Sequence, residues 1–432
     1  MKQYVYSELS ADQYARLLKR PLISYDDIFS VVRPIIQDVA SRGDLAIREY
    51  TLRYDGVELD EVVVPVRDIH EIELPEVTKQ AFHTAYQNIR TFHEAQIPEI
   101  LRIETMPGVV CERHPRAIDR VGLYVPGGSA VLPSSVLMLG VPAQLAGCKT
   151  VVLATPPSKS GTIPAEVEFA ASLCGIRKVL LAGGAQAVAA MAYGTETVSK
   201  VDKILGPGNQ FVTAAKMLLQ NSDALISIDM PAGPSEVMVV ADGTANPAYV
   251  AADLLSQAEH GPDSQVVLLS LPGFDIDQLE FELNRQTSEL PRGTIASKAL
   301  ANSYSVLCEY TDEALILLND YAPEHLILAV EHADEVLKQV RNAGSVFMGN
   351  WTPESVGDYA SGTNHTLPTY GYARMYSGVS IDSFLKQMTV QRLSPEGLRN
   401  LGPKVEIMAR SESLEAHARA VSIRLTDLKI TE

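Results

Sequence analysis

From about residue 118, short β-branched and aliphatic runs alternate with amphipathic stretches, and this alternation limits the fold more than any other feature. The runs that we expect to be strands are 120–125, 150–154, 178–181, 203–205 and 225–228, then 236–240, 265–270, 305–309, 326–330 and 345–348. They recur roughly every 25–30 residues, the length of a strand–helix unit that builds a parallel sheet. The sequence therefore predicts an α/β protein with two tandem Rossmann-like lobes and mainly parallel sheets, plus helical N- and C-terminal extensions.

The stretches outside these strands are expected to be helical. Apolar residues at three-and-four spacing predict helices within 26–54, 76–95, 247–259, 312–321 and 333–342. Ser10 and Gln13 have the spacing of a capping box. The first ~115 residues and the part after about 380 are expected to be mostly helical. Between them, 351–378 is rich in Gly, Tyr, Thr and Pro and is too long for an idle connection, so we expect it to be functional.

Composition narrows the class of partner. The chain has 432 residues, with 36 basic and 53 acidic side chains and a net charge of −17. This balance argues against a nucleic acid or an anionic membrane as partner, because both attract clustered Lys and Arg. No apolar run reaches the ~18 residues of a membrane span, and the N-terminal residues do not resemble a signal or transit peptide. We expect a soluble, cytoplasmic protein. Its four cysteines show no C-x-x-C spacing and are expected to be reduced thiols.

Three expected strands run into glycine-rich turns that open helices. These turns are Pro126-Gly127-Gly128-Ser129, Gly183-Gly184-Ala185-Gln186 and Gly206-Pro207-Gly208-Asn209. In a parallel sheet they share the carboxyl edge, where backbone N–H groups and helix N-termini favour an anion. The G-x-G-x-x-G dinucleotide fingerprint is absent, so an anion site and ordinary tight turns both remain open.

Four of the nine histidines have polar neighbours in the sequence that suggest a functional site. His260 follows Gln257 by three residues, which suits either a metal-ligand pair or a histidine at a helix C-terminus. His325 follows Glu324, and an extended segment would point the two to opposite faces. His365 and Asp358 share the long polar segment. Gln257, His260, Asp358 and His417 together would be a nitrogen and oxygen ligand set suited to zinc, manganese or cobalt, although their spacing does not establish it.

Six longer motifs make a resemblance specific. They are Ala182-Gly183-Gly184-Ala185-Gln186-Ala187, Gly206-Pro207-Gly208-Asn209, Ala232-Gly233-Pro234-Ser235-Glu236, Asp253-Leu254-Leu255-Ser256-Gln257-Ala258-Glu259-His260, Pro323-Glu324-His325-Leu326 and Gly362-Thr363-Asn364-His365-Thr366-Leu367-Pro368-Thr369. In this order they resemble the histidinol dehydrogenase family over nearly the whole chain. The resemblance implies NAD-dependent, four-electron oxidation of L-histidinol to L-histidine through enzyme-bound L-histidinal, the last step of histidine biosynthesis.

The resemblance also implies cofactors and residue roles. It implies a homodimer with one zinc per subunit, held by Gln257, His260, Asp358 and His417. Glu324 and His325 match the acid–base pair, and Tyr124, Gln186 and Asn209 match NAD contacts. The matching substrate contacts are Ser235, Gln257, His260, His325, Asp358, His365, Glu412 and His417. The C-terminal tail that carries His417 is expected to complete the partner subunit's site.

With these roles we expect four parts. They are an N-terminal helical arm at 1–24, an α/β lobe of 25–117 plus 236–376 with the metal and catalytic residues, an NAD-binding lobe at 118–235, and a helical dimerisation tail at 377–432. Two alternatives differ in chemistry. One is an aldehyde-dehydrogenase-like oxidoreductase with a catalytic cysteine, for which Cys308 is the nearest candidate. The other is a two-lobe metal-binding module without catalysis.

Overall fold

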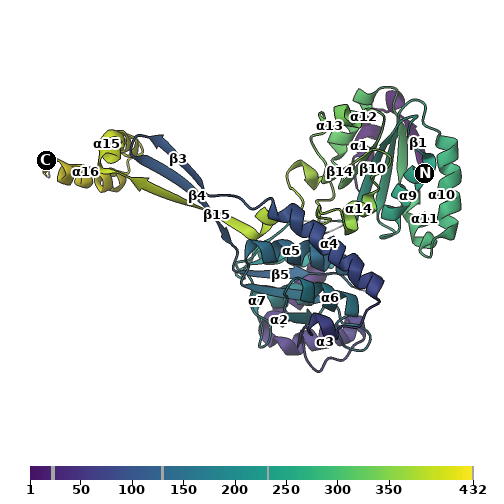
Figure 1. The fold of residues 1–432 in the computed structure, drawn as a ribbon, viewed down its shortest axis with the longest axis horizontal. Helices are drawn as coiled ribbons and strands as arrows, with labels where there is room; N and C mark the ends of the chain where they lie inside the picture. Colours follow the sequence, from purple (N-terminus) through teal and green to yellow (C-terminus); the bar gives the residue numbers. More distant parts are fainter. Residues whose placement is uncertain (21–24, 128–130, 231–232, 431–432) are drawn as a thin grey trace. The chain divides into compact units, whose positions relative to one another are not determined.

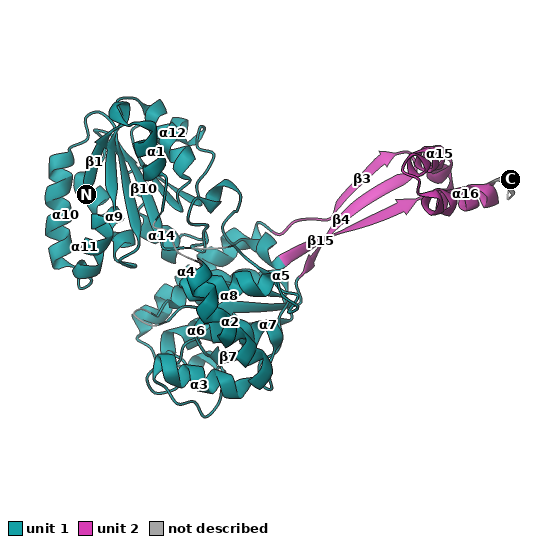
Figure 2. Cartoon of the chain, turned by 180° about the vertical axis from the view of Figure 1, so that it is seen from behind, with its two compact units in different colours: residues 1–96, 118–384 teal, residues 97–117, 385–432 magenta. Residues whose placement is uncertain are grey.

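The computed structural model describes residues 1–20, 25–127, 131–230 and 233–430. It divides into two units, residues 1–96 with 118–384, and residues 97–117 with 385–432 (Figures 1 and 2). Among the described residues, no helix combines the length and apolar character that crossing a membrane requires.

The first lobe of the larger unit is built on a six-stranded sheet. Its strand order is β2 (Val63–Pro65), β7 (Lys178–Leu181), β6 (Thr150–Thr155), β5 (Arg120–Tyr124), β8 (Lys203–Leu205) and β9 (Ser227–Ile228). All neighbours pair in parallel except β2, which is antiparallel to β7. One face packs on α2 (Tyr25–Arg42), α3 (Asp44–Asp55), α7 (Gly184–Tyr193) and α8 (Gln210–Gln220). The other packs on α4 (Glu76–Glu94), α5 (Pro133–Ala146) and α6 (Ala165–Leu173).

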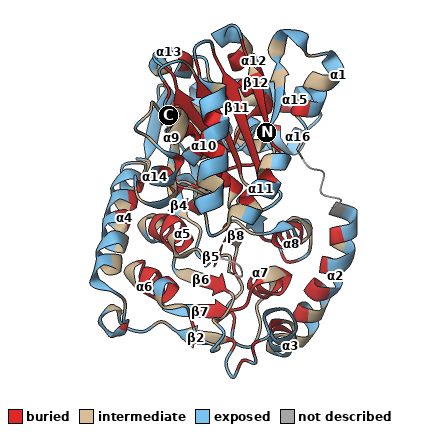
Figure 3. Cartoon of the chain, turned by 90° about the vertical axis from the view of Figure 1, so that its right-hand side faces the viewer, coloured by how far each residue is buried: buried red, intermediate tan, exposed pale blue. Residues whose placement is uncertain are grey.

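The second lobe repeats this architecture with a fully parallel sheet. Its order is β1 (Lys2–Val5), β12 (Tyr304–Leu307), β11 (Gln265–Ser270), β10 (Glu236–Ala241), β13 (His325–Ala329) and β14 (Ser345–Met348). One face is covered by α9 (Pro247–Ala258), α10 (Ile276–Glu289) and α11 (Gly293–Ala301). The other is covered by α1 (Ala11–Leu17), α12 (Thr311–Tyr321) and α13 (Ala333–Leu337). Strands buried on both faces read as continuous apolar runs, and Figure 3 shows β11 and β12 as buried behind helices with exposed outer faces.

The smaller unit is an antiparallel sheet followed by two helices. The sheet order is β15 (Leu385–Leu393), β4 (Val109–Ala117) and β3 (Leu101–Met106). The helices α15 (Pro395–Ser411) and α16 (Glu415–Ile430) pack on each other, since a side chain at Gly402 would meet Val421 and Leu425. Ser413, with φ of 61°, breaks the helix between them.

The predicted α/β class with two mainly parallel lobes is confirmed, as is the capping box at Ser10 and Gln13. The extensions are mostly helical, as expected, but several segments within them are strands. The N-terminal arm begins with β1, a strand of the second lobe's sheet. Residues 101–106 and 109–117 form a local β-hairpin, and residues 385–393 form a strand that pairs with it from far away in the sequence, so these segments are strands rather than helices.

The expected domain borders also differ from the packing. Helices α2, α3 and α4 were assigned to the lobe of residues 236–376, yet their apolar faces bury against the sheet of the first lobe. Buried residues such as Ile36 and Ile89 supply these faces. Helical periodicity identifies the buried face of a helix but not the sheet that it covers.

Candidate active site

The candidate site draws on opposite edges of the two sheets. In the first lobe, turns 183–186 and 206–209 follow the carboxyl ends of β7 and β8, as expected, while Gly128 and Ser129 of the third turn lie outside the described residues. In the second lobe, Glu236 and His325 begin β10 and β13, so this lobe contributes the amino ends of its strands. The helices α9 and α12 end on this side, where the helix dipole favours positive charge.

The imidazole of His325 is the centre of the buried polar cluster. Only 3% of its side chain is exposed. Its Nδ1 atom lies 3.0 Å from Gln257 Nε2 and 3.1 Å from the Glu236 carbonyl, and its Nε2 atom lies 3.2 Å from Asp358 Oδ1. A neutral ring accepts from Gln257, whereas a charged ring donates to the Glu236 carbonyl. Nδ1 therefore has a partner in both protonation states, as an acid–base group requires.

Carboxyl groups control the charge of this ring. Burial lowers the pKa of His325, but Glu354, Glu324 and the hydrogen bond to Asp358 outweigh it, so the pKa lies well above its usual value. Burial raises the pKa of Glu324 and, more strongly, that of Glu354. The Asp358 carboxyl is also buried, yet its hydrogen bond to His325 keeps its pKa low. The carboxyl groups around the ring thus set its charge, and their own pKa values are shifted in opposite directions.

Gln257 and Glu324 flank the ring in a way that the sequence did not predict. We expected Glu324 and His325 to point to opposite faces, but Glu324 Oε2 lies 3.6 Å from His325 Nδ1. Glu324 precedes β13 and is not bound by the strand alternation. The same Oε2 accepts a hydrogen bond of 2.8 Å from the Glu236 backbone N–H, which fixes the carboxylate beside the ring.

Three of the four predicted metal ligands lie near this cluster. Gln257 lies in the last turn of α9, and its Oε1 atom is buried without a hydrogen-bond partner in the described part of the chain. His260 follows in the turn after α9, and burial lowers its pKa, although the charge of Asp358 opposes this. An unpaired buried amide oxygen, a neutral imidazole and a carboxylate are donors that zinc accepts, so these residues fit a metal.

His365 is oriented by partners on both ring nitrogens. Its Nδ1 atom donates to the Asp358 carbonyl at 2.8 Å, because a carbonyl oxygen only accepts. Its Nε2 atom then accepts from Ser135 Oγ at 3.0 Å. Burial lowers the pKa of His365, which favours the neutral ring. Through His365, the long segment 351–378 thus contacts α5 of the first lobe.

A cavity of about 680 Å³ opens beside these residues. Its walls include Pro207, Asn209, Ser235, His260 and Tyr370. It therefore brings together a predicted NAD contact, a predicted substrate contact and a predicted metal ligand.

The other two predicted NAD contacts, Tyr124 and Gln186, are buried and do not line this cavity. The Tyr124 hydroxyl accepts from Gly184 N at 3.0 Å, so it holds the glycine turn in place.

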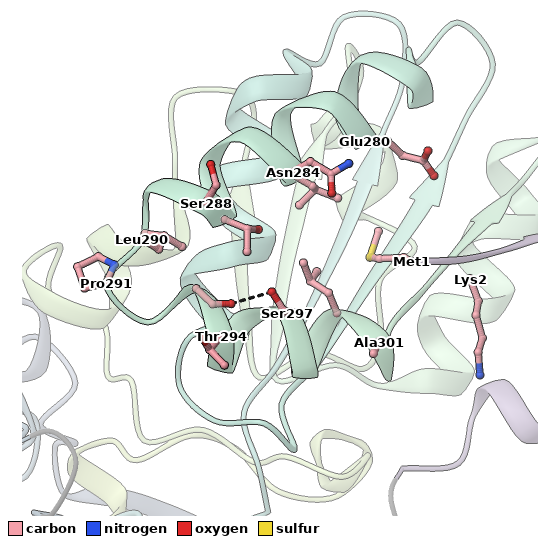
Figure 4. A pocket seen from close by; sticks show the side chains of 14 residues that line it. Met1, Lys2, Glu280, Asn284, Ser288, Leu290, Pro291, Thr294, Ser297 and Ala301 are labelled. Atoms are coloured by element: carbon pink, nitrogen blue, oxygen red, sulfur yellow. Dashed lines mark hydrogen bonds between the residues drawn. The ribbon is translucent and has the colours of Figure 1, made fainter.

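A wider cavity of about 930 Å³ lies against α10, α11 and the N-terminal strand (Figure 4). None of the predicted site residues lines it, and its walls contain no histidine.

Two predicted site residues lie in the smaller unit. Glu412 follows the last residue of α15, and His417 lies in the first turn of α16; both are exposed. The left-handed backbone at Ser413 separates the two residues by a break between the helices. On α16, Val421 and Leu425 pack against Gly402 of α15.

Sequence reasoning missed several members of the cluster. Glu354 is 1% exposed, and neither of its carboxyl oxygens has a hydrogen-bond partner in the described residues. One ligand atom each from His325, Glu354 and Asp358 lies within 4.8 Å of the others. In the sequence, Glu354 looks like an ordinary acid in a first helical turn, and only its place in the long segment hints at a role. Sequence reasoning also assigned no role to Ser135 or Glu236, although Glu236 lies in one of the six motifs.

The thiols do not support a cysteine nucleophile. The four cysteines are free, as predicted. Burial raises the pKa of Cys308 to about 12, and that of Cys148 likewise, so these thiols are not thiolates at neutral pH. Two α/β lobes with a buried imidazole between carboxyl groups are instead an arrangement suited to an enzyme that uses acid–base chemistry.

Comparisons identify the family. A sequence model described as histidinol dehydrogenase matches residues 18–425. The chain is 60% identical over 433 residues to a chloroplastic histidinol dehydrogenase of Oryza sativa subsp. japonica, covering 100% of this chain and 91% of that protein. It is 53% identical over 422 residues to a histidinol dehydrogenase of Bacteroides thetaiotaomicron, covering 97% and 98%. The crystal structure of histidinol dehydrogenase from Elizabethkingia anophelis aligns with a TM-score of 0.94 at 47% identity, covering 99% of both chains. The chain belongs to the histidinol dehydrogenase family and is an oxidoreductase of histidine biosynthesis.

Proposed function

We propose that this enzyme uses NAD to oxidise L-histidinol to L-histidine through L-histidinal, with His325 and Glu324 as the acid–base pair. The observation that carries the proposal is the buried His325 ring, which has a hydrogen-bond partner for Nδ1 in both protonation states. His325 takes the alcohol proton, and Glu324, 3.6 Å away, takes a proton from the water that adds to the aldehyde. No thiol is needed for this route. The cytoplasmic location stays a prediction.

Zinc and NAD are part of the proposal. Gln257, His260 and Asp358 would hold the metal, as the unpaired Gln257 Oε1 atom supports. Zinc held there would supply a Lewis acid that orients the substrate. NAD supplies the hydride acceptor, and Asn209 at the N-terminus of α8, with Tyr124 and Gln186 beneath the glycine turn, would bind it. Ser235 and His365 would contact the substrate.

We also propose a homodimer in which the partner subunit's Glu412 and the partner subunit's His417 complete each site. A helix break between two exposed polar residues supports this, because a straight helix would separate them by about 140°. Homodimers of His417→Ala and of His260→Ala should both be inactive. Refolding the two together should restore up to about a quarter of wild-type activity, since half the dimers are mixed and one of their two sites is intact. Mixed, zinc-loaded dimers without activity would show that His417 serves its own subunit.

The function is tested by NADH formation at 340 nm with L-histidinol. His325→Asn should lower the rate on the order of 10²–10⁴-fold. His332→Asn, at an exposed histidine, is the matched control and should behave as the wild type. Wild-type protein loaded with zinc that forms no NADH from L-histidinol would refute the proposed function. A loss below tenfold in His325→Asn would refute only the role of His325.

A further inference from the structure

Arg20 joins the N-terminal segment to the acid–base cluster through Glu236. Its guanidinium makes a two-pronged ion pair with Glu236, from Nε to Oε1 at 2.9 Å and from Nη2 to Oε2 at 3.0 Å. The two side chains are 6% and 1% exposed. Such a fork fixes the orientation of a carboxylate as well as its charge.

The guanidinium is itself held rigidly. Its carbon lies 3.5 Å from the centre of the Tyr321 ring, which is fully buried. Nη2 also donates to the Tyr321 carbonyl at 2.7 Å, and Nη1 donates to the Leu18 carbonyl at 3.0 Å. Arg20 therefore anchors Glu236 to the end of α12, three residues before Glu324.

Glu236 in turn touches the proposed catalytic pair. Its N–H donates to Glu324 Oε2 at 2.8 Å, and its carbonyl lies 3.1 Å from His325 Nδ1 and accepts from Gln257 Nε2 at 3.3 Å. Its side-chain Oε1 also accepts from Tyr370 N at 3.0 Å, and Tyr370 lines the cavity. One residue thus links both members of the pair, one proposed metal ligand and a wall of the cavity.

We propose that Arg20 is a positioning residue for the Glu324–His325 pair, acting through Glu236. This inference rests on the function proposed above. Arg20 touches neither substrate nor cofactor in this scheme. Its fork holds the Glu236 peptide in register with the Glu324 carboxylate and the His325 ring, so its loss moves the acid–base groups rather than the NAD-binding turns.

The test replaces Arg20 and compares kcat with KM. Arg20→Met should lower kcat about 10²-fold, since a displacement near 1 Å is enough for such a loss. KM for NAD should stay within twofold, because the glycine turns belong to the other lobe. Arg20→Lys, which keeps the charge but not the fork, should recover part of the kcat loss but not all of it. Arg16→Met, at an exposed arginine of α1, is the matched control and should have wild-type kcat.

A second measurement is independent of activity. Hydrogen exchange at the Glu236 amide, which donates to Glu324, should become faster in Arg20→Met and stay unchanged in Arg16→Met. Folded Arg20→Met with a kcat within threefold of wild type and an unchanged Glu236 amide would overturn the proposal. So would a loss that only follows the folded fraction.

If Arg20→Met does not fold, the same two measurements are made on Arg20→Lys. A lowered kcat and faster exchange of the Glu236 amide would support the proposal. Wild-type values of both would overturn it. If the wild type itself did not oxidise L-histidinol, the proposed function would fail, and the amide exchange alone would decide whether Arg20 holds the Glu236 peptide.

Discussion

Replacing Lys216 by methionine should destabilise the first lobe and weaken NAD binding. Lys216 and Asp229 form an ion pair with side chains only 4% and 2% exposed. The pair holds the glycine turn, since Asp229 Oδ2 accepts from Gly206 N at 2.7 Å and Lys216 Nζ donates to the Gly206 carbonyl at 2.9 Å. Gly206 has φ of 119°, and a side chain there would meet the Tyr124 carbonyl, so the turn has few alternatives.

The size of the effect follows from the charge left behind. Removing one partner of a buried ion pair costs about 3–5 kcal/mol, mainly because the other charge stays buried. Lys203 interacts with Asp229 and compensates part of this charge, so we expect the free energy of unfolding to fall by about 3 kcal/mol. In Lys216→Met with Asp229→Asn, the unpaired charge is gone, so more than half of the lost stability should return.

The assay is urea unfolding followed by circular dichroism, together with KM for NAD. KM should rise in Lys216→Met while kcat changes less. Arg120→Met, which breaks the solvent-exposed pair with Asp202, is the control and should leave the unfolding midpoint unchanged. A loss below about 1 kcal/mol in Lys216→Met, or a double variant no more stable than the single one, would contradict the reasoning.

Three further predictions concern the site. Chelation should abolish turnover, and zinc or manganese should restore it, since nitrogen and oxygen sites accept several divalent ions; full activity after exhaustive metal removal would refute the metal site. Glu324→Gln should slow oxidation of L-histidinal more than that of L-histidinol, and equal loss on both substrates would show that Glu324 does not activate the water. Burial raises the pKa of Asp253 from 3.8 to about 7 in the folded protein, so the folded state binds more protons than the unfolded state between these values and stability falls as pH rises from about 4 to about 7. Asp253→Asn should remove this loss, giving a gain over wild type that grows with pH toward about 4 kcal/mol; a gain independent of pH would refute the argument.

Local periodicity was sufficient to predict most of the α/β elements. The strands 150–154, 178–181 and 265–270 and the helix at 76–95 match β6, β7, β11 and α4 to within about one residue. These segments can be predicted from local sequence because a strand buried on both faces is continuously apolar. A helix covering a sheet likewise repeats its apolar residues every three or four positions. The motifs were likewise sufficient to predict the family, because assigning a family requires the identity and order of residues but not their geometry.

Only the tertiary structure decided which elements meet. Strand β1 joins β12 and β15 joins β4 across hundreds of residues, and neither pairing leaves a periodic signal that distinguishes it from a short helix or an irregular segment. The same holds for the site. Glu324 lies beside His325 instead of on the opposite face, and Glu354 and Arg20 join the cluster from segments with no distinctive pattern. Sequence patterns report how each residue relates to its neighbours along the chain, whereas the pKa of a buried carboxyl or the orientation of an imidazole depends on groups that the fold brings within a few ångströms.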